Sequence, residues 1–166
     1  MKTYLGSLPN TGRDEQWRDN GIRPPKNVIE KDVTKGLEQK SLSRIMFTGP
    51  FEWTGKNRYH LESMTQALRI KLREVMREDL SGTYFVSVRG KTTHYPTEEY
   101  RIEISFGGDP DRIEELTNAA FQQIDSLKAF GTTQKYLTKV KETQRRERET
   151  DLRKNEFWLN TLSFYG

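Results

Sequence analysis

The sequence feature that most constrains the fold is a change of hydrophobic period on either side of residues 81–82. Between residues 57 and 79, apolar side chains recur every three or four positions, at Leu61, Met64, Leu68, Leu72 and Val75. This spacing predicts a helix with one buried face. After Ser81 and Gly82, the stretch TYFVSVRGKT has the β-branched and aromatic content of a strand. We therefore expect a helix that leads directly into a sheet.

Two further stretches have the pattern of strands. Residues 41–49, SLSRIMFTG, form a short run that is closed by Gly49 and Pro50. In the second, apolar residues at Tyr100, Ile102, Ile104 and Phe106 alternate with Arg101, Glu103 and Ser105. Only a short turn around Tyr95-Pro96 separates this strand from the preceding one, so the two are expected to pair antiparallel.

Two more helices are predicted downstream. Asp109 and Pro110 make a favourable helix start, because aspartate can cap the free amides and proline loses no hydrogen bond at the first helical position. The helix that follows should end at Gly131 and bury Ile113, Leu116, Ala120, Ile124 and Leu127. Thr132 or Thr133 should cap a third helix, which becomes highly charged and ends at Phe157-Trp158-Leu159. The predicted fold class is α+β, an antiparallel sheet with helices packed on one face.

The chain divides into two parts by composition. Residues 1–40 contain few apolar side chains and several prolines and glycines, and are predicted to be a loop-rich linker; residues 41–166 should form the α+β domain. The opening KTYLGSLP is typical of a helix end that runs into a loop. We therefore expect this chain to be a fragment, with the N-terminal part of its domain missing.

Several kinds of catalytic site are disfavoured by the sequence. Cysteine is absent, and neither His60 nor His94 fits HExxH or the inverted HxxEH motif of zinc peptidases. No GxSxG elbow is present, and the glycines before Asp109 lack the lysine of a phosphate-binding loop. The chain alone is therefore predicted to hold no metal.

Charge and hydropathy give no strong sign of a nucleic acid or a membrane as partner. The net charge is only +4, and the arginines of RRERETDLRK alternate with acids that can pair with them along a helix. A solvated helix is therefore favoured over a nucleic-acid surface. No apolar run approaches the roughly 18 residues that a membrane span needs.

The segment REDLSGTY, residues 77–84, is the candidate site. Arg77 completes a stripe with Arg69 and Arg73 along one side of the first helix, and Tyr84 begins the following strand. In isolation these are ordinary surface and strand residues, and that interpretation stays open. Their placement at one junction also suits chemistry, because a phenol can donate a hydrogen bond to an oxyanion and a guanidinium can hold a peptide carbonyl.

Three stretches, LREVMREDLSGTYFVSV, EEYRIEISFGGDPDRIEEL and GTTQKYLTKVKETQRRERETDLRKNEFWLNTL, resemble the C-terminal region of the pitrilysin/insulinase family of zinc metallopeptidases. The similarity is greatest to bacterial members with two tandem halves. The opening YLGSLP and WRDNGIRPP also fit this family, so the resemblance covers nearly the whole chain. Its most specific element is the R-x6-Y spacing of Arg77 and Tyr84.

The resemblance implies four related α+β domains in two halves that close around a chamber. HxxEH and the zinc would belong to the first domain, while Arg77 and Tyr84 would reach across from the last. Tyr84 would stabilise the oxyanion at the scissile carbonyl, and Arg77 would hold the substrate backbone. This chain lacks HxxEH, so it should bind no catalytic zinc and be inactive alone; zinc is expected in the full-length protein.

The expected partners are a peptide or unfolded polypeptide substrate and the catalytic N-terminal half of the same protein. Exported bacterial relatives favour the periplasm or cell envelope, with the cytoplasm as the alternative location. A non-catalytic scaffold or partner subunit of the same family is the alternative function, and a basic nucleic-acid-binding module is a third.

Overall fold

The computed structural model describes residues 3–4, 6–9, 12–14, 16 and 18–165. The chain forms two compact units, Met1–Asp32 and Val33–Gly166. The described residues before Ser41 form neither helix nor strand. Leu5 and Trp17, which belong to the two N-terminal stretches that carry the family resemblance, lie outside the described residues. Within the first unit, a hydrogen bond from Arg23 is the main cause that lowers the pKa of Asp19 to about 2.

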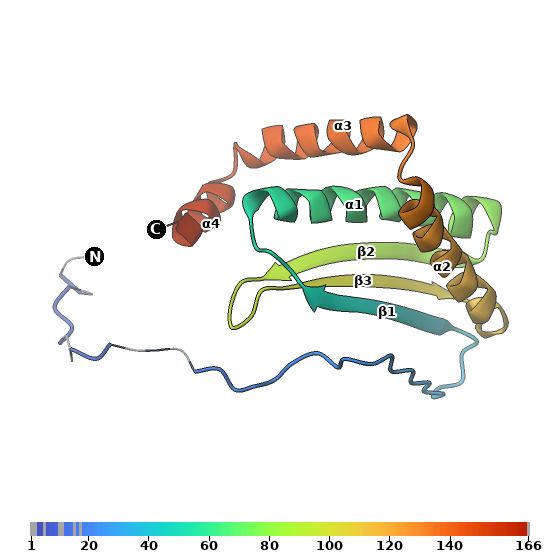
Figure 1. Cartoon of the computed structure of the whole chain (residues 1–166), viewed down its shortest axis with the longest axis horizontal. Coiled ribbons are helices and arrows are strands. Elements are labelled where there is room, and N and C mark those ends of the chain that lie inside the picture. Colours follow the sequence, from blue (N-terminus) through green and yellow to red (C-terminus); the bar gives the residue numbers. More distant parts are fainter. Residues whose placement is uncertain (1–2, 5, 10–11, 15, 17, 166) are drawn as a thin grey trace. The chain divides into compact units, whose positions relative to one another are not determined.

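Three antiparallel strands form the sheet, in the order β1-β3-β2 (Figure 1). They are β1 (Ser41–Pro50), β2 (Thr83–Thr93) and β3 (Glu99–Gly108). Ile104 in the central strand lies opposite Ile45 on one side and Val88 on the other. The three predicted strands and the antiparallel pairing of the last two are confirmed.

Helices pack on one face of this sheet. Helix α1 (Gly55–Arg73) continues into a π-helical turn, η1 (Glu74–Asp79), and α2 (Ile113–Phe130) crosses the same layer (Figure 1). The central side chains are buried between the helices and the sheet; they are Leu68, Leu72, Met76, Val88, Ile104, Phe106, Leu116 and Ala120. Burial of these apolar side chains is the main force that holds the layers together. The predicted α+β class, with helices on one face of an antiparallel sheet, is confirmed.

The predicted buried face of the first helix is wrong at Met64. That side chain is 40% exposed, whereas the neighbouring Thr65 is only 4% exposed and Met76 is fully buried. The reason lies in β2, where Gly90 leaves room for α1 to approach closely. A Cβ at Gly90 would lie 3.0 Å from Thr65 Cγ2, so this contact sets which side of the helix faces the sheet.

The start and end of α2 follow the prediction. Asp109 accepts a hydrogen bond from the Asp111 amide at 2.9 Å, and Pro110 opens a single 3₁₀ turn, η2 (Pro110–Arg112), that precedes the helix. At the other end, Gly131 has a φ of 69°, a left-handed conformation that glycine adopts without a steric penalty.

The third predicted helix is two helices. Helix α3 (Gln134–Asp151) lies along α1 on the side away from the sheet, and a short break separates it from α4 (Asn155–Tyr165) (Figure 1). The backbone turns at residues 152–154, where the Lys154 amide donates to the Asp151 carbonyl at 2.9 Å and the Trp158 indole donates to the Leu152 carbonyl at 2.8 Å. These bonds use carbonyl groups that a continuing helix would need.

The expectation that a threonine side chain caps this region is corrected. Thr133 precedes α3, but its side chain makes no capping hydrogen bond. Phe157 is half-buried, whereas Trp158 is 46% and Leu159 66% exposed, so this cluster is only partly anchored within the chain.

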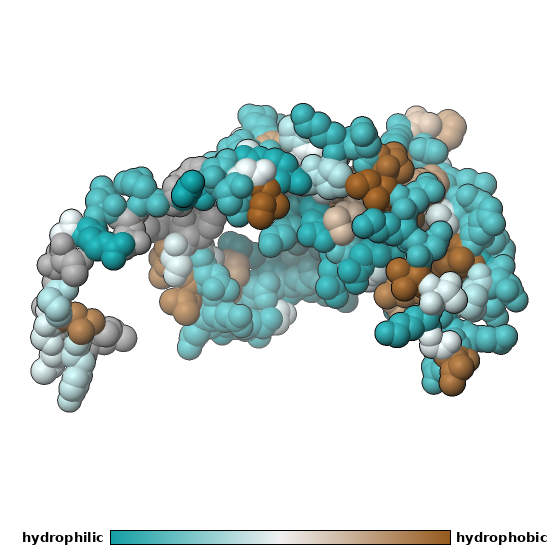
Figure 2. All heavy atoms as spheres, turned by 90° about the horizontal axis from the view of Figure 1, so that it is seen from below, coloured by the Kyte–Doolittle hydropathy of each residue, from teal (hydrophilic) through white to brown (hydrophobic). Residues whose placement is uncertain are grey.

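The surface carries mixed polarity. The face shown in Figure 2 is mainly hydrophilic, with apolar residues in separate patches. Of the helices in the part of the chain that the structure describes, none is long and apolar enough to cross a membrane.

Candidate functional site

The junction Arg77–Tyr84 is irregular at each step. In η1, the Leu80 amide donates to the Val75 carbonyl, five residues earlier, at 3.0 Å. Such π-helical turns are rare and are often found at functional sites. Ser81 follows with a φ of 49°, which is uncommon for a residue other than glycine. The chain thus reverses direction between helix and strand within a few residues.

A β-bulge at Tyr84 forms the other side of the junction. Thr83 lies opposite Gly108 and Phe85 lies opposite Gly107, so Tyr84 is an extra residue without a partner in β3. The buried Thr83 hydroxyl is 2.7 Å from the Phe85 carbonyl and stabilises this arrangement. Bulges re-aim side chains and are over-represented next to active sites. The Tyr84 side chain is 69% exposed.

Tertiary contacts with the core, with β3 and with Arg112 fix the backbone of the junction. Met76 is fully buried, and its carbonyl accepts a hydrogen bond from the Gly82 amide at 3.1 Å. A Cβ at Gly108 would lie only 2.6 Å from the Gly82 carbonyl oxygen, so the two backbones touch. The Arg112 guanidinium donates to the Leu80 carbonyl at 3.1 Å. The turn is therefore held by both β3 and the start of α2.

Arg112 is itself held by Glu115, whose carboxylate accepts from Arg112 Nε at 2.9 Å. This hydrogen bond lowers the pKa of Glu115 and raises the pKa of Arg112. Both groups therefore stay charged across the neutral range.

The sequence did not single out Arg112 or the contact between Gly82 and Gly108. The signal that could have indicated the contact between Gly82 and Gly108 is the pair of adjacent glycines, Gly107-Gly108, at the end of β3.

Both predicted site residues are exposed at this junction. Arg77 lies in η1 and Tyr84 at the start of β2, two elements that pack against each other. In the part of the chain that the structure describes, neither side chain makes a hydrogen bond or ion pair, with the other or with any third group. The arrangement leaves a phenol donor and a guanidinium free for an external acceptor, such as a carbonyl or oxyanion oxygen.

The two histidines do not form a metal site. His60 lies on α1, while His94 lies in the connection between β2 and β3, where its ring stacks on Trp53 at 4.6 Å and its Nδ1 is 3.0 Å from Glu98. Among the described residues, no group of three or more histidine, aspartate or glutamate side chains could hold a metal ion. A zinc ligand set does not fit the residues present here.

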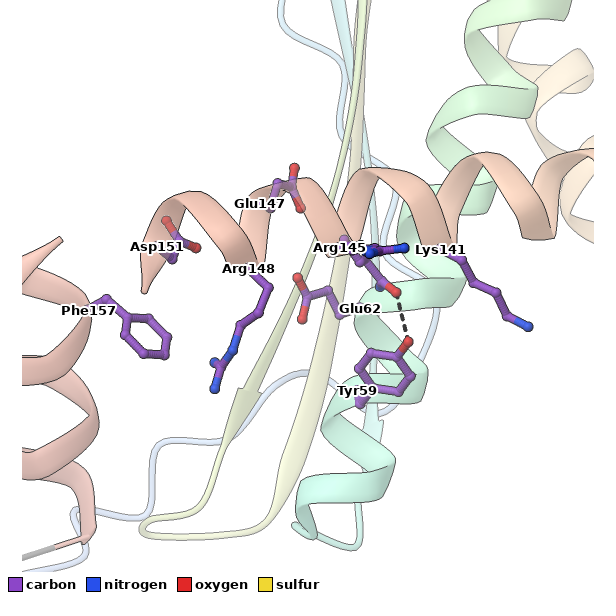
Figure 3. A pocket seen from close by; sticks show the side chains of 9 residues that line it. Tyr59, Glu62, Lys141, Arg145, Glu147, Arg148, Asp151 and Phe157 are labelled. Atoms are coloured by element: carbon purple, nitrogen blue, oxygen red, sulfur yellow. Dashed lines mark hydrogen bonds between the residues drawn. The ribbon is translucent and has the colours of Figure 1, made fainter. Parts of the chain in front are cut away.

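Apart from the junction, the structure has a hollow between α1, α3 and the start of α4 (Figure 3). In the wall of this hollow, Tyr59 Oη of α1 donates a hydrogen bond to Gln144 Oε1 of α3 at 2.9 Å and so links the two helices. Arg148 is 4.6 Å from the Phe157 ring and Arg145 pairs with Glu149 at 3.2 Å, so much of its charge is engaged locally. We interpret this hollow as part of the packing between helices. The junction of Arg77 and Tyr84 is the stronger candidate for a functional site.

Comparison with known proteins gives a family match over most of the chain. A family model described as the Peptidase M16 inactive domain matches residues 1–144. The probable zinc protease PqqL of Haemophilus influenzae is 28% identical over 138 residues, which are 82% of this chain and 14% of that protein.

Solved structures share the fold. The periplasmic protease PqqL from Escherichia coli superposes with a TM-score of 0.66 at 22% identity, over 76% of this chain and 14% of that chain. A mutant of the ferredoxin protease FusC, solved in complex with Arabidopsis ferredoxin, gives 0.59 at 20% identity, over 70% of this chain and 13% of that chain. The chain thus spans about one seventh of the length of these relatives.

Proposed function

The chain belongs to the M16 peptidase family, which confirms the pitrilysin/insulinase resemblance, and from this premise we propose that it presents Arg77 and Tyr84 to a peptide enclosed in a larger zinc peptidase. The observation that carries the proposal is the junction itself. Two irregular turns place both side chains at the surface, and the buried Met76 and the Gly82–Gly108 contact fix the backbone beneath them. A site needs such rigid support to act on a bound substrate.

The proposed roles follow from the chemistry of the two groups. The Tyr84 phenol donates a hydrogen bond to the oxyanion that forms when water adds to the scissile carbonyl. A donor aimed at developing charge stabilises the transition state more than the ground state. Arg77 donates to a substrate carbonyl nearby and keeps the peptide extended, because its planar guanidinium offers several donors in a fixed geometry.

The metal belongs to another part of the full-length protein in this proposal, because the residues that the structure describes include no group of side chains that could hold it. When bound there, zinc supplies an activated water for hydrolysis. The contribution of this chain is limited to holding the peptide and stabilising its oxyanion.

The relatives also support a proposal for the partner of this chain and for its location in the cell. An inactive domain implies a catalytic half in the same protein, with the substrate between them. The Escherichia coli relative is described as periplasmic, and we assign the same compartment to this protein. Osmotic-shock fractionation tests the location; recovery of the protein with the cytoplasmic marker contradicts it.

The decisive variant is Tyr84→Phe in the full-length protein. Removal of one oxyanion donor should lower kcat by roughly 10²–10³-fold, with zinc content unchanged. Arg77→Lys should chiefly raise KM, because the charge stays and the forked geometry is lost. Tyr95→Phe is the matched control, since Tyr95 is also exposed, at 65%, and lies in the connection between β2 and β3.

Near-normal turnover of Tyr84→Phe contradicts the assigned role of that residue. The alternative function, a scaffold or partner subunit without activity, makes a different prediction. In that case the full-length wild type contains no stoichiometric zinc and cleaves no peptide, so metal analysis alone decides between the two.

A further inference from the structure

A groove of about 410 Å³ runs beside β2, at the edge of the sheet. Its lining includes Arg69 and Arg73 from α1 and Val86 and Ser87 from β2. Among the described strands, β2 pairs only with β3, so the outer edge of β2 keeps backbone amides and carbonyls without a strand partner. An edge of this kind is a template for an added strand.

The helix beside this edge presents three cations. Arg69, Arg73 and Arg77 are all exposed, and in the described part of the chain none of them makes an ion pair. Glu74, which lies between Arg73 and Arg77 in the sequence, is already occupied, because it accepts from Lys139 at 3.0 Å and from the Tyr136 hydroxyl. Glu74 is therefore not available to neutralise the stripe.

The spacing of the stripe matches that of an extended peptide. Arg69 and Arg73, four positions apart on α1, are separated by about 6 Å along the helix axis. Alternate residues of a strand, which point to the same side, are separated by about 6.6–6.8 Å. Helix α1 lies alongside β2 (Figure 1), with Thr65 close to Gly90 and Arg69 and Arg73 close to Val86 and Ser87. Two alternate side chains of an added strand would thus meet Arg69 and Arg73.

We propose that the outer edge of β2 binds an extended acidic segment of the peptide substrate, with carboxylates at alternate positions facing Arg69 and Arg73. This inference rests on the proposed function and names the substrate class. A peptide suits the site because a strand edge offers both donors and acceptors for a peptide backbone. Arg77 is the member of the stripe nearest to Tyr84 in the sequence. The acidic segment would extend from Arg77 along β2, past Arg73 and Arg69.

The experiment compares three fluorogenic peptides of equal length in the full-length enzyme. One carries three glutamates at alternate positions beside the scissile bond, one carries glutamines there, and one carries the three glutamates consecutively. The alternating peptide should have a KM up to about tenfold lower than the glutamine peptide, as expected for two exposed ion pairs. The consecutive peptide should lie between them, because only part of its charge can face the stripe.

The double variant Arg69→Gln/Arg73→Gln should remove the preference for the alternating peptide and leave kcat for the glutamine peptide unchanged. The matched control is Arg146→Gln/Arg153→Gln, which makes the same change in net charge at two exposed positions of another region. This control should keep the preference.

Equal KM values for the alternating and glutamine peptides overturn the inference. So do equal values for the alternating and consecutive peptides, which is the result expected if another strand of the full-length protein already covers β2. In each case the glutamine peptide is still cleaved, and Tyr84→Phe still reduces its turnover, so the proposed function survives. Absence of any cleavage by the wild type contradicts the proposed function itself.

Discussion

Two helices of this chain end in different ways. Helix α1 ends through η1, where the last turn is packed on the core by Met76 and tied to β3 and α2 by Gly82 and Arg112. Helix α3 ends through contacts with its own neighbours in sequence, such as Lys154 with Asp151 at 2.9 Å. The first end is fixed by tertiary structure, and the second by local hydrogen bonds.

This difference indicates which part of the fold can support a functional site. Side chains that project from the first end, Arg77 and Tyr84, rest on a backbone that buried contacts determine. Apolar side chains of α4, the helix that follows the second end, are also poorly covered: Leu159 and Leu162 are 66% and 68% exposed. Rigid support therefore exists at one helix end and is weak at the other.

The largest expected effect comes from Met76→Ala. Met76 is fully buried beside Arg77, so its truncation should leave a cavity and cost about 2–5 kcal/mol in the free energy of unfolding. Urea unfolding of the purified chain measures this. Met64→Ala is the matched control on the same helix, since Met64 is 40% exposed, and it should cost less than about 1 kcal/mol. Equal costs would show that the end of α1 is no better packed than its exposed side.

An intermediate effect is expected at Glu74, which joins η1 to α3. Hydrogen bonds from Tyr136 and then Lys139 lower its pKa in the folded state. A lowered pKa stabilises the fold above the pKa of the unfolded chain, and this contribution is lost as the pH falls through the folded value. Glu74→Gln should therefore cost about 1 kcal/mol at pH 7.

The cost of Glu74→Gln should be smaller than at pH 7 at an acidic pH below the lowered folded-state pKa of Glu74, where the wild-type carboxylate becomes protonated. Urea midpoints at the two pH values provide the measurement. Glu78→Gln, which removes an exposed acid from the same turn, serves as the control and should change the free energy of unfolding by less than about 0.5 kcal/mol. A cost that is independent of pH would place the effect in packing instead of charge.

The smallest effect is expected at Trp158, in the second region. Trp158 is 46% exposed and its indole donates a hydrogen bond to the nearby Leu152 carbonyl, so Trp158→Ala should change the free energy of unfolding by less than about 1 kcal/mol. Circular dichroism and urea unfolding check this value. A cost comparable to that of Met76→Ala would mean that α4 is anchored as firmly as η1, and the contrast between the two helix ends would disappear.

Much of the fold was predictable because it follows local rules. The alternation in β3, the Asp109-Pro110 start of α2 and the Gly131 end each depend on residues within a few positions of the feature. The placement of Arg77 and Tyr84 at one helix-to-strand junction followed in the same way. Their roles stay predictions that the variants above test.

The features that the sequence did not reveal depend on distant contacts. Thr65 replaces Met64 on the buried face because Gly90, in a different element, admits the helix there. The bulge at Tyr84 requires the register of β3, and the support of Gly82 requires Gly108. The break after α3 contains no glycine or proline, so the sequence carries no local signal for it. Hydrophobic periodicity carries none of this information.

The bulge at Tyr84 also has an evolutionary consequence. Because this residue has no partner across the sheet, an exchange of its side chain leaves the pairing of Thr83 with Gly108 and of Phe85 with Gly107 intact. Selection can therefore act on position 84 for chemistry alone, whereas the neighbours on either side are constrained by the register. A lineage that gains or abandons the phenol would do so by point substitution, with no rebuilding of the domain around it.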